Sequence, residues 1–248
     1  MGIWAGIKYA LNSTLGTSGF KSLDKLILLY LYPELSSNIV EYAEPGNYKI
    51  VVPPNVTQIK VTACGGGGGG QYGRGQASSA GGGGGAAIKD TIYTVTPLQL
   101  LEITVGERGT AGNFENTEPI AATNGGTTVI SNIVTLPGGM APLDTSDGER
   151  RKGGKAGGAG GGDGGNQGSD GKAGLSAGGK TGTDYYDKGG GGGGSLGIGG
   201  NARGASPSFT DGEKGGGGAG GGGGSSSNNR SNGTNGGSGY VKIEFIGW

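Results

Sequence analysis

The spacing of apolar residues changes from helical to alternating near residue 42. Before that point two short helices are predicted, the first ending near Gly16 and the second running from an N-cap at Ser22 to Pro33. Their apolar faces contain Ile3, Trp4, Ile7, Leu11, Leu23, Leu26, Ile27, Tyr30 and Leu31. Residues 1–42 are therefore predicted to form a small α-helical N-terminal module.

Two short helices bury little surface by themselves, so the apolar faces of this module need a partner. Packing within the chain and docking onto another protein are both open on this pattern. If the module docks, the candidate docking residues are Ile3, Trp4, Ile7, Leu11, Phe20, Leu26 and Tyr30.

From Tyr42 onward β-forming residues alternate with polar ones, which is typical of half-buried strands. Strands are predicted at residues 47–52, 58–63, 87–95, 100–105, 127–130 and 240–245. The last of these lies about 100 residues beyond the others. We expect it to pair with the earlier strands, so that the intervening glycine-rich half is tied at both of its ends.

Glycine accounts for 66 of the 248 residues, and 40 of these fall between Gly148 and Gly239. Such runs usually indicate linkers or disorder, because glycine loses the most backbone freedom on folding. Collagen is excluded, since the triplet register breaks and this half contains only Pro207. Cross-β stacking is excluded because β-forming residues are missing.

One ordered arrangement remains for the glycine runs, namely packed extended helices of the polyproline II type made of glycine. Such a helix has three residues per turn and no internal hydrogen bonds, so its N–H and C=O groups point outward to neighbours. Runs such as Gly189–Gly194, Gly215–Gly218 and Gly220–Gly224 can then pack closely, because no Cβ keeps them apart. The predicted fold class is mainly β with a glycine-rich (polyglycine II) helix bundle over residues 43–248, behind the α-helical module at 1–42.

Charge and composition argue against several classes of function. Nineteen acidic residues balance nineteen basic ones, so neither nucleic acid nor an anionic membrane is an expected partner. The chain has no histidine and only one cysteine, Cys64, so we expect no imidazole catalysis, no metal, no cofactor and no internal disulfide. No signal peptide is apparent, and the apolar stretch 26–31 is too short to insert into a membrane. A soluble, non-enzymatic protein made in the cytoplasm is expected.

Two short motifs suggest chemistry that their context does not support. Residues 174–181 match a P-loop formally, but neither a preceding strand nor a following helix is predicted there. The aspartates at 163, 170, 184 and 187 lack the spacing of a calcium loop.

Residues 44–64, which read EPGNYKIVVPPNVTQIKVTAC and run into six glycines, resemble the opening of the glycine-rich domain of bacteriophage tail fibres and tip adhesins. Gly81–Gly85 before a strand, the stretch 101–106 and the closing stretch 239–245 repeat that pattern. The resemblance covers roughly residues 43–246. It implies polyglycine II helices whose connecting loops contact a receptor on the bacterial host.

Residues 6–16 also resemble the start of virion proteins in phages and prophages of clostridia-like bacteria. This second resemblance implies that residues 1–42 attach the protein to another virion protein of the tail or baseplate, or of the capsid. The chain has no long shaft, so we expect an appendage or tip in the virion, with a homo-oligomer left open.

The loops between glycine runs are the best candidates for contacting a receptor. They are rich in Tyr, Ser, Asn and Arg, which rigid frameworks favour in binding loops. The candidate receptor contacts are Tyr72, Arg74, Tyr185, Tyr186, Arg203, Phe209 and Arg230. Ordinary solvated turns are the alternative for each loop. Two alternative functions also remain, a capsid or tail decoration protein without receptor binding and a bacterial glycine-rich surface protein.

Overall fold

The computed structural model of the chain describes residues 38–74, 80–115, 118–142, 196, 211–215 and 230–248. Residues 1–37 of the helical module predicted over residues 1–42 lie outside these ranges, and so do all seven candidate docking residues. Within them the structure is mainly β and contains no helix. The strands are β1 (Ile39–Tyr42), β2 (Gly46–Val51), β3 (Gln58–Cys64), β4 (Gly73–Arg74), β5 (Ala87–Thr94), β6 (Leu100–Val105), β7 (Asn113–Glu115), β8 (Glu118–Ile120), β9 (Thr128–Ile130), β10 (Val134–Leu136), β11 (Arg230–Ser231) and β12 (Tyr240–Ile246).

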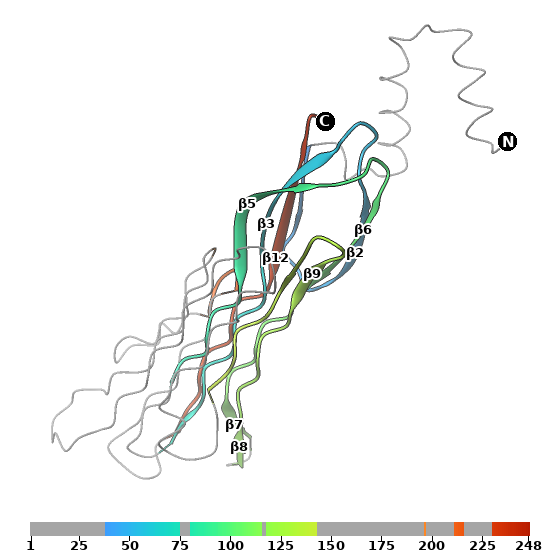
Figure 1. Cartoon of the computed structure of the whole chain (residues 1–248). Helices are drawn as coiled ribbons and strands as arrows, with labels where there is room; N and C mark the ends of the chain where they lie inside the picture. The colour runs from blue at the N-terminus through green and yellow to red at the C-terminus, as the bar shows by residue number, and fades with distance from the viewer. Residues whose placement is uncertain (1–37, 75–79, 116–117, 143–195, 197–210, 216–229) are drawn as a thin grey trace, which may run out of the picture.

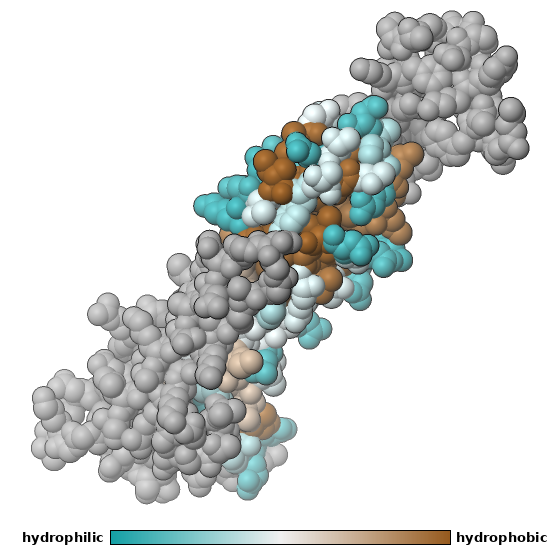
Figure 2. All heavy atoms as spheres, in the orientation of Figure 1, coloured by the Kyte–Doolittle hydropathy of each residue, from teal (hydrophilic) through white to brown (hydrophobic). Residues whose placement is uncertain are grey.

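Two antiparallel sheets of four strands form one end of the described structure (Figure 1). One sheet has the order β1-β12-β3-β5 and the other the order β10-β9-β6-β2. Their inner faces share one hydrophobic core, to which Val61 and Ile243 contribute from the first sheet and Ile103 and Ile130 from the second. In β6 the exposed and buried residues alternate without exception, as expected for a strand with one wet face. On the face shown in Figure 2, most of the hydrophobic atoms lie over this end.

The six strands predicted from the sequence are present, with boundaries shifted by one residue or less. The predicted return of the last strand is also confirmed, because β12 pairs with β3 along its whole length. Strands β10 and β1 of the sandwich were not predicted. β1 pairs with β12 and extends the sheet into the segment assigned to the N-terminal module, since Ile39 and Val40 are β-branched and Val40 is buried.

Below the sandwich the strands continue as extended segments that remain in register with one another. We call residues 65–72, 80–86, 106–112, 122–127, 137–142, 211–215 and 232–239 the glycine bundle. In the β3–β12 ladder Cys64 faces Tyr240. Three residues farther along Gly67 donates to Gly237, then Gly70 donates to Thr234, and finally Gly73 faces Ser231 in the β4–β11 ladder. One antiparallel pair thus runs from the sandwich to the opposite end of the described structure.

Segment 65–71 lies inside the bundle and changes its hydrogen-bond partner at each residue. The amides of residues 65, 68 and 71 donate to the carbonyls of 86, 83 and 80. The amides of residues 66 and 69 donate to the carbonyls of residues 126 and 123. The amides of residues 67 and 70 donate to the carbonyls of residues 237 and 234. Every one of these seven bonds measures 2.8–3.1 Å, and the same neighbour returns after three residues. A β-strand, in contrast, bonds on two sides with a period of two.

The bundle therefore joins the two sheets directly through backbone hydrogen bonds. Segment 65–71 continues β3 of the first sheet, yet it bonds to segments that continue β6 and β9 of the second sheet. In the sandwich, side chains hold the two sheets about 10 Å apart. In the bundle, backbones that share hydrogen bonds lie only about 5 Å apart.

This close approach explains the need for glycine in the bundle. A Cβ built at Gly66, Gly68, Gly69, Gly82 or Gly85 falls closer than 3.0 Å to a backbone carbonyl of a neighbouring segment. Real Cβ atoms essentially never come so close.

The strands confirm the mainly β part of the predicted fold class. The glycine runs at 189–194, 216–218 and 220–224 lie outside the described residues.

Candidate functional site

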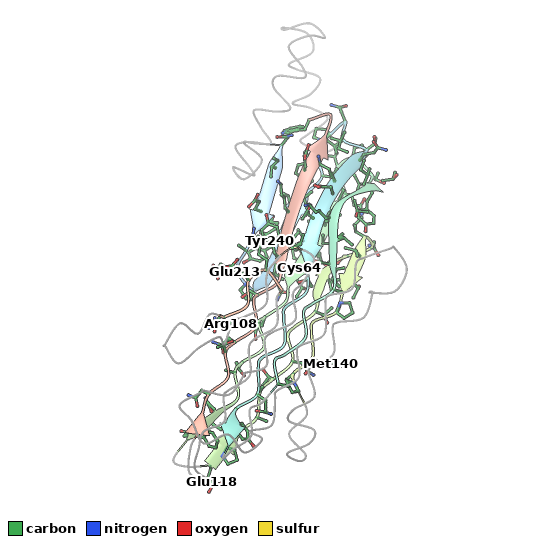
Figure 3. The ribbon with its side chains drawn as sticks, turned by 90° about the vertical axis from the view of Figure 1, so that its left-hand side faces the viewer. Cys64, Arg108, Glu118, Met140, Glu213 and Tyr240 are labelled. Carbon is green, nitrogen blue, oxygen red and sulfur yellow. The ribbon has the colours of Figure 1, made fainter. Side chains whose placement is uncertain are left out.

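The first and the last described residues of the chain lie at the same end of the described structure. β1 lies antiparallel to β12, and the amide of Phe245 donates to the carbonyl of Asn38 at 2.8 Å. The short ladders β4–β11 and β7–β8 lie at the opposite end of the glycine bundle, which we call the distal end (Figure 1). Figure 3 shows Glu118 at this extremity, far from Cys64 and Tyr240 beside the sandwich.

The distal end is assembled from segments that the bundle carries to the same level. The amide of Gly112 donates to the carbonyl of Gly70 at 2.9 Å, which aligns these two segments in parallel. Two residues farther along, the ring of Tyr72 packs edge-on against that of Phe114, with centroids 4.8 Å apart. β4 and β7 are therefore neighbours.

Gln71 fixes the root of the β7–β8 hairpin to the centre of the bundle. Its side chain is fully buried, and its Oε1 accepts hydrogen bonds from the amides of Tyr72 (3.1 Å) and Ala122 (3.2 Å). A Cβ at Gly112 would collide with the same oxygen, so the sequence needs glycine opposite this glutamine. The Nε2 of Gln71 and the Oδ1 of Asn113 are buried and have no hydrogen-bond partner within the described structure.

Polar side chains also supply acceptors where the bundle lacks a neighbouring backbone. The Oδ1 atoms of Asn235 and Asn124 accept from the amides of Ala111 (2.9 Å) and Ala141 (2.8 Å), respectively. Asn235 is held in turn by Asp211, which also forms an ion pair of 3.4 Å with Arg108. The margin of the bundle is therefore closed by side chains rather than left as open backbone.

The predicted receptor contacts meet different outcomes. Tyr72 is only 2% exposed and packs against Phe114, so its ring contributes to packing and is not displayed for a receptor. Its exposure was expected because it follows a glycine run, yet the segment that carries it runs inside the bundle. Arg74 and Arg230 are brought together as partners in the β4–β11 ladder. Tyr185, Tyr186, Arg203 and Phe209 lie outside the described residues.

The sequence did not point to the β7–β8 hairpin as part of the candidate site. Glu115 faces Glu118, and all three residues of β8 are exposed, including Ile120 at 41%. Pro119 concealed the strand, because proline is depleted in strands and is confined mostly to their edges. The only signal was the position of this segment between two glycine-containing stretches that the bundle carries to the distal end.

Among the described residues, the titratable groups with shifted pKa values lie in or beside the sandwich. Burial raises the pKa of the Cys64 thiol to about 12, so this thiol stays protonated near neutral pH. Burial and a hydrogen bond with Glu41 raise the pKa of Tyr240 to about 12, and Lys214 lies 4.5 Å above its ring centroid. In the described part of the chain no three His, Cys, Asp or Glu residues group as metal ligands. The described ranges also contain no helix with the length and hydropathy needed to span a membrane.

Comparison with known proteins gives one family. Residues 43–246 match the family described as "Glycine-rich domain", and this match covers most of the chain. No curated protein matches the chain.

Proposed function

The chain belongs to the glycine-rich domain family, and we propose that it is a non-enzymatic virion protein of a bacteriophage or prophage. In this proposal it is a tail fibre or tip component that binds a receptor on the bacterial surface. Residues 1–42 attach it to another virion protein, and the loops at the far end of the glycine bundle contact the receptor.

The separation of the two ends of the molecule is the main support for this proposal. The described chain begins and finishes beside the sandwich, where β1 pairs with β12. Residues far apart in the sequence, in β4, β7, β8 and β11, meet at the opposite end. A protein fixed through the segment before β1 presents its distal end away from the attachment point, as an adhesive tip requires.

The second part of the proposal is that the glycine bundle is a polyglycine II bundle. It is supported by the change of hydrogen-bond partner at every residue of segment 65–71 and by its three-residue repeat. A second row of hydrogen bonds in the same bundle has the same three-residue period, since the amides of Gly233, Gly236 and Gly239 donate to the carbonyls of Gly112, Gly109 and Gly106, respectively. Bonds that run in several directions make such a bundle stiff, so it holds the distal loops in fixed positions.

Two alternative functions share this architecture. A decoration protein on capsid or tail would use the same attachment and bind nothing at its distal end. A bacterial glycine-rich surface protein would carry the same domain on a cell instead of a particle. The adhesive tip is favoured because charged and apolar residues, Glu118 and Ile120 among them, are exposed at the distal end.

A competition experiment tests the proposal directly. The purified full-length chain is added to host cells before the phage particles, and the rate of particle adsorption is measured. The full chain is required because a fragment starting at residue 43 would lack the edge strand β1. We expect adsorption to fall, and to recover partly when the competitor carries Tyr185→Ala and Tyr186→Ala.

A variant with Lys49→Gln and Glu102→Gln in the sandwich is the matched control and should compete like the wild type, because it lies away from the distal end. A chain that is incorporated into particles but neither binds cells nor competes would favour the decoration protein. Its absence from particles and presence on the bacterial surface would favour the surface protein.

A further inference from the structure

The turn between β5 and β6 holds a leucine in a backbone conformation that favours glycine. The amide of Gln99 donates to the carbonyl of Thr96 at 3.0 Å, and Pro97 and Leu98 lie between them. Leu98 has a φ of 65° at the third position of this turn. That is the pattern of a type II turn, in which the third residue needs a positive φ and is usually glycine or asparagine. A leucine in this conformation costs stability.

Hydrogen bonds fix this turn to the end of β2. The amide of Leu98 donates to the carbonyl of Val52 at 2.9 Å, and the amide of Val52 donates to the carbonyl of Gln99 at 2.8 Å. Within the turn, the Oε1 of Gln99 accepts from the amide of Thr96 at 3.0 Å. Leu98 is therefore held in one position by its neighbours.

The side chain held in this way is exposed rather than packed. Leu98 is 62% exposed, and Leu100, two residues farther along at the start of β6, is 49% exposed. Single exposed leucines are common and need no explanation, but a strained leucine beside a second exposed one indicates a surface that binds something. Glycine at position 98 would relieve the strain and remove the exposed side chain. We call Leu98 and Leu100 the leucine pair.

The leucine pair lies at the end of the sandwich where the described chain begins. Gln58 faces both Thr94, the last residue of β5, and Ile246, the last residue of β12. The turn that follows β5 is thus level with the end of β12, where the carbonyl of Asn38 accepts a hydrogen bond from the amide of Phe245. Figure 1 shows the connection from β5 to β6 at this end, away from the glycine bundle.

The small size of the leucine pair favours a partner that is tethered to it. Two partly exposed leucines supply only a small part of the roughly 800 Å² that each of two separate molecules buries in a stable interface. A tethered segment needs less area, because a short linker gives it an effective concentration in the millimolar range. The second predicted helix ends at Pro33, and the linker from there to Asn38 spans at most about 17 Å.

We propose that the leucine pair is the docking site for the apolar face of residues 22–33 of the same chain. This face contains Leu23, Leu26, Ile27, Tyr30 and Leu31, which the sequence predicts on one side of a helix that needs a partner. The apolar residues of the first predicted helix remain available for the other virion protein. Docking fixes the attachment module relative to the sandwich, so the distal end points in one direction from the attachment point. The inference rests on the proposed function only for this last consequence.

Photochemical cross-linking of the purified full-length chain tests what covers the leucine pair. A benzophenone amino acid replaces Leu98 or, in the matched control, Met140, which is 50% exposed on the glycine bundle. Mass spectrometry then locates the cross-links. We expect position 98 to cross-link to residues 22–33 within one chain, and position 140 to give no cross-link to that segment.

Hydrogen exchange of a double variant tests whether the leucine pair holds the segment. Leu98→Gly with Leu100→Thr removes both exposed side chains and suits the local structure, since the turn favours glycine and strands favour threonine. We expect the amides of residues 22–33 to exchange about tenfold faster in this variant, while the amides of β3 and β12 keep their protection. Met140→Gln, the control, should exchange like the wild type throughout.

Each experiment has an outcome that overturns the inference. Cross-links from position 98 that join two chains would assign the leucine pair to a second copy, and the absence of any cross-link to residues 22–33 would also refute docking. Unchanged exchange of residues 22–33 in the double variant, with β3 and β12 still protected, is equally decisive. A chain that meets both expectations but is absent from phage particles overturns the proposed function instead, and the docking site stands.

Discussion

Replacing Gly68 with alanine tests whether the glycine bundle depends on the close approach of its backbones. A Cβ at Gly68 lies 2.5 Å from the carbonyl carbon of Met140 and 2.8 Å from the amide nitrogen of Ala141. Ordinary contacts of this kind measure 3.4–4 Å. Segments 65–72 and 137–142 must therefore separate by roughly 1 Å in the variant.

The cost of this separation follows from the bonds that it disturbs. It stretches the bond from Gly139 to Gly66 (2.8 Å) and the bond from Gly83 to Met140 (2.9 Å). Two weakened hydrogen bonds cost about 2 kcal/mol, and overpacking adds about 1–3 kcal/mol. The lower entropy of the unfolded alanine chain returns up to about 1 kcal/mol. We expect a net loss of about 2–4 kcal/mol in the free energy of unfolding, and a fall in the thermal midpoint of roughly 4–15 °C.

Differential scanning calorimetry of the full chain measures this fall, with Gly247→Ala as the matched control. A Cβ at Gly247 meets nothing within 4 Å, although its φ of 81° favours glycine. The control should therefore lose only about 1 kcal/mol from backbone strain. The reasoning is refuted if Gly68→Ala unfolds at the wild-type temperature, or falls no further than the control.

Three further predictions concern the sandwich and its junction with the bundle. Because burial raises the pKa of Cys64 to about 12 from its ordinary value of 9.0, the folded thiol should resist iodoacetamide at pH 8 and react only on unfolding. The contribution of this thiol to stability is complete below pH 9 and is lost as the pH rises toward 12. The hydrogen bond with Lys49 lowers the pKa of Glu102 from its ordinary value of 4.5, so Lys49→Gln should raise the pKa that NMR measures for this carboxyl. This pair stabilises the fold above pH 4.5 and ceases to do so as the pH falls through the lowered pKa. Deleting residues 1–42 should lower the thermal midpoint more than deleting residues 1–36, since only the longer deletion removes β1 and uncovers β12; equal midpoints would contradict a structural role for β1.

Six of the eight strands of the sandwich could be predicted from the sequence, because each of these six has its own local signal. The alternation of Leu101, Ile103 and Val105 with polar neighbours identifies β6 without knowledge of its partners. The closure by β12 also followed, since an isolated strand beyond a long polar stretch needs a sheet to join. β1, β10 and the short strands β4, β7, β8 and β11 were missed because each is only two to four residues long, and in β8 Pro119 is a residue that strands rarely contain.

The candidate site was less predictable because long-range register decides it. Tyr72 looked displayed, but Phe114 meets it only after the chain has left the distal end and returned. The opposition of Arg74 and Arg230 is likewise set by the β3–β12 ladder, whose register the bundle carries through to the distal end. Glycine runs carry no such information in themselves, since every residue in them is the same.

Amide hydrogen exchange measures most directly whether segment 65–71 is a rigid, hydrogen-bonded strut. Each of these seven consecutive amides has a backbone acceptor in a neighbouring segment. We expect all seven amides to exchange as slowly as the paired amides of β3 and β12. Exchange of the glycine amides at the rate of an unstructured chain, while β3 and β12 stay protected, would contradict it.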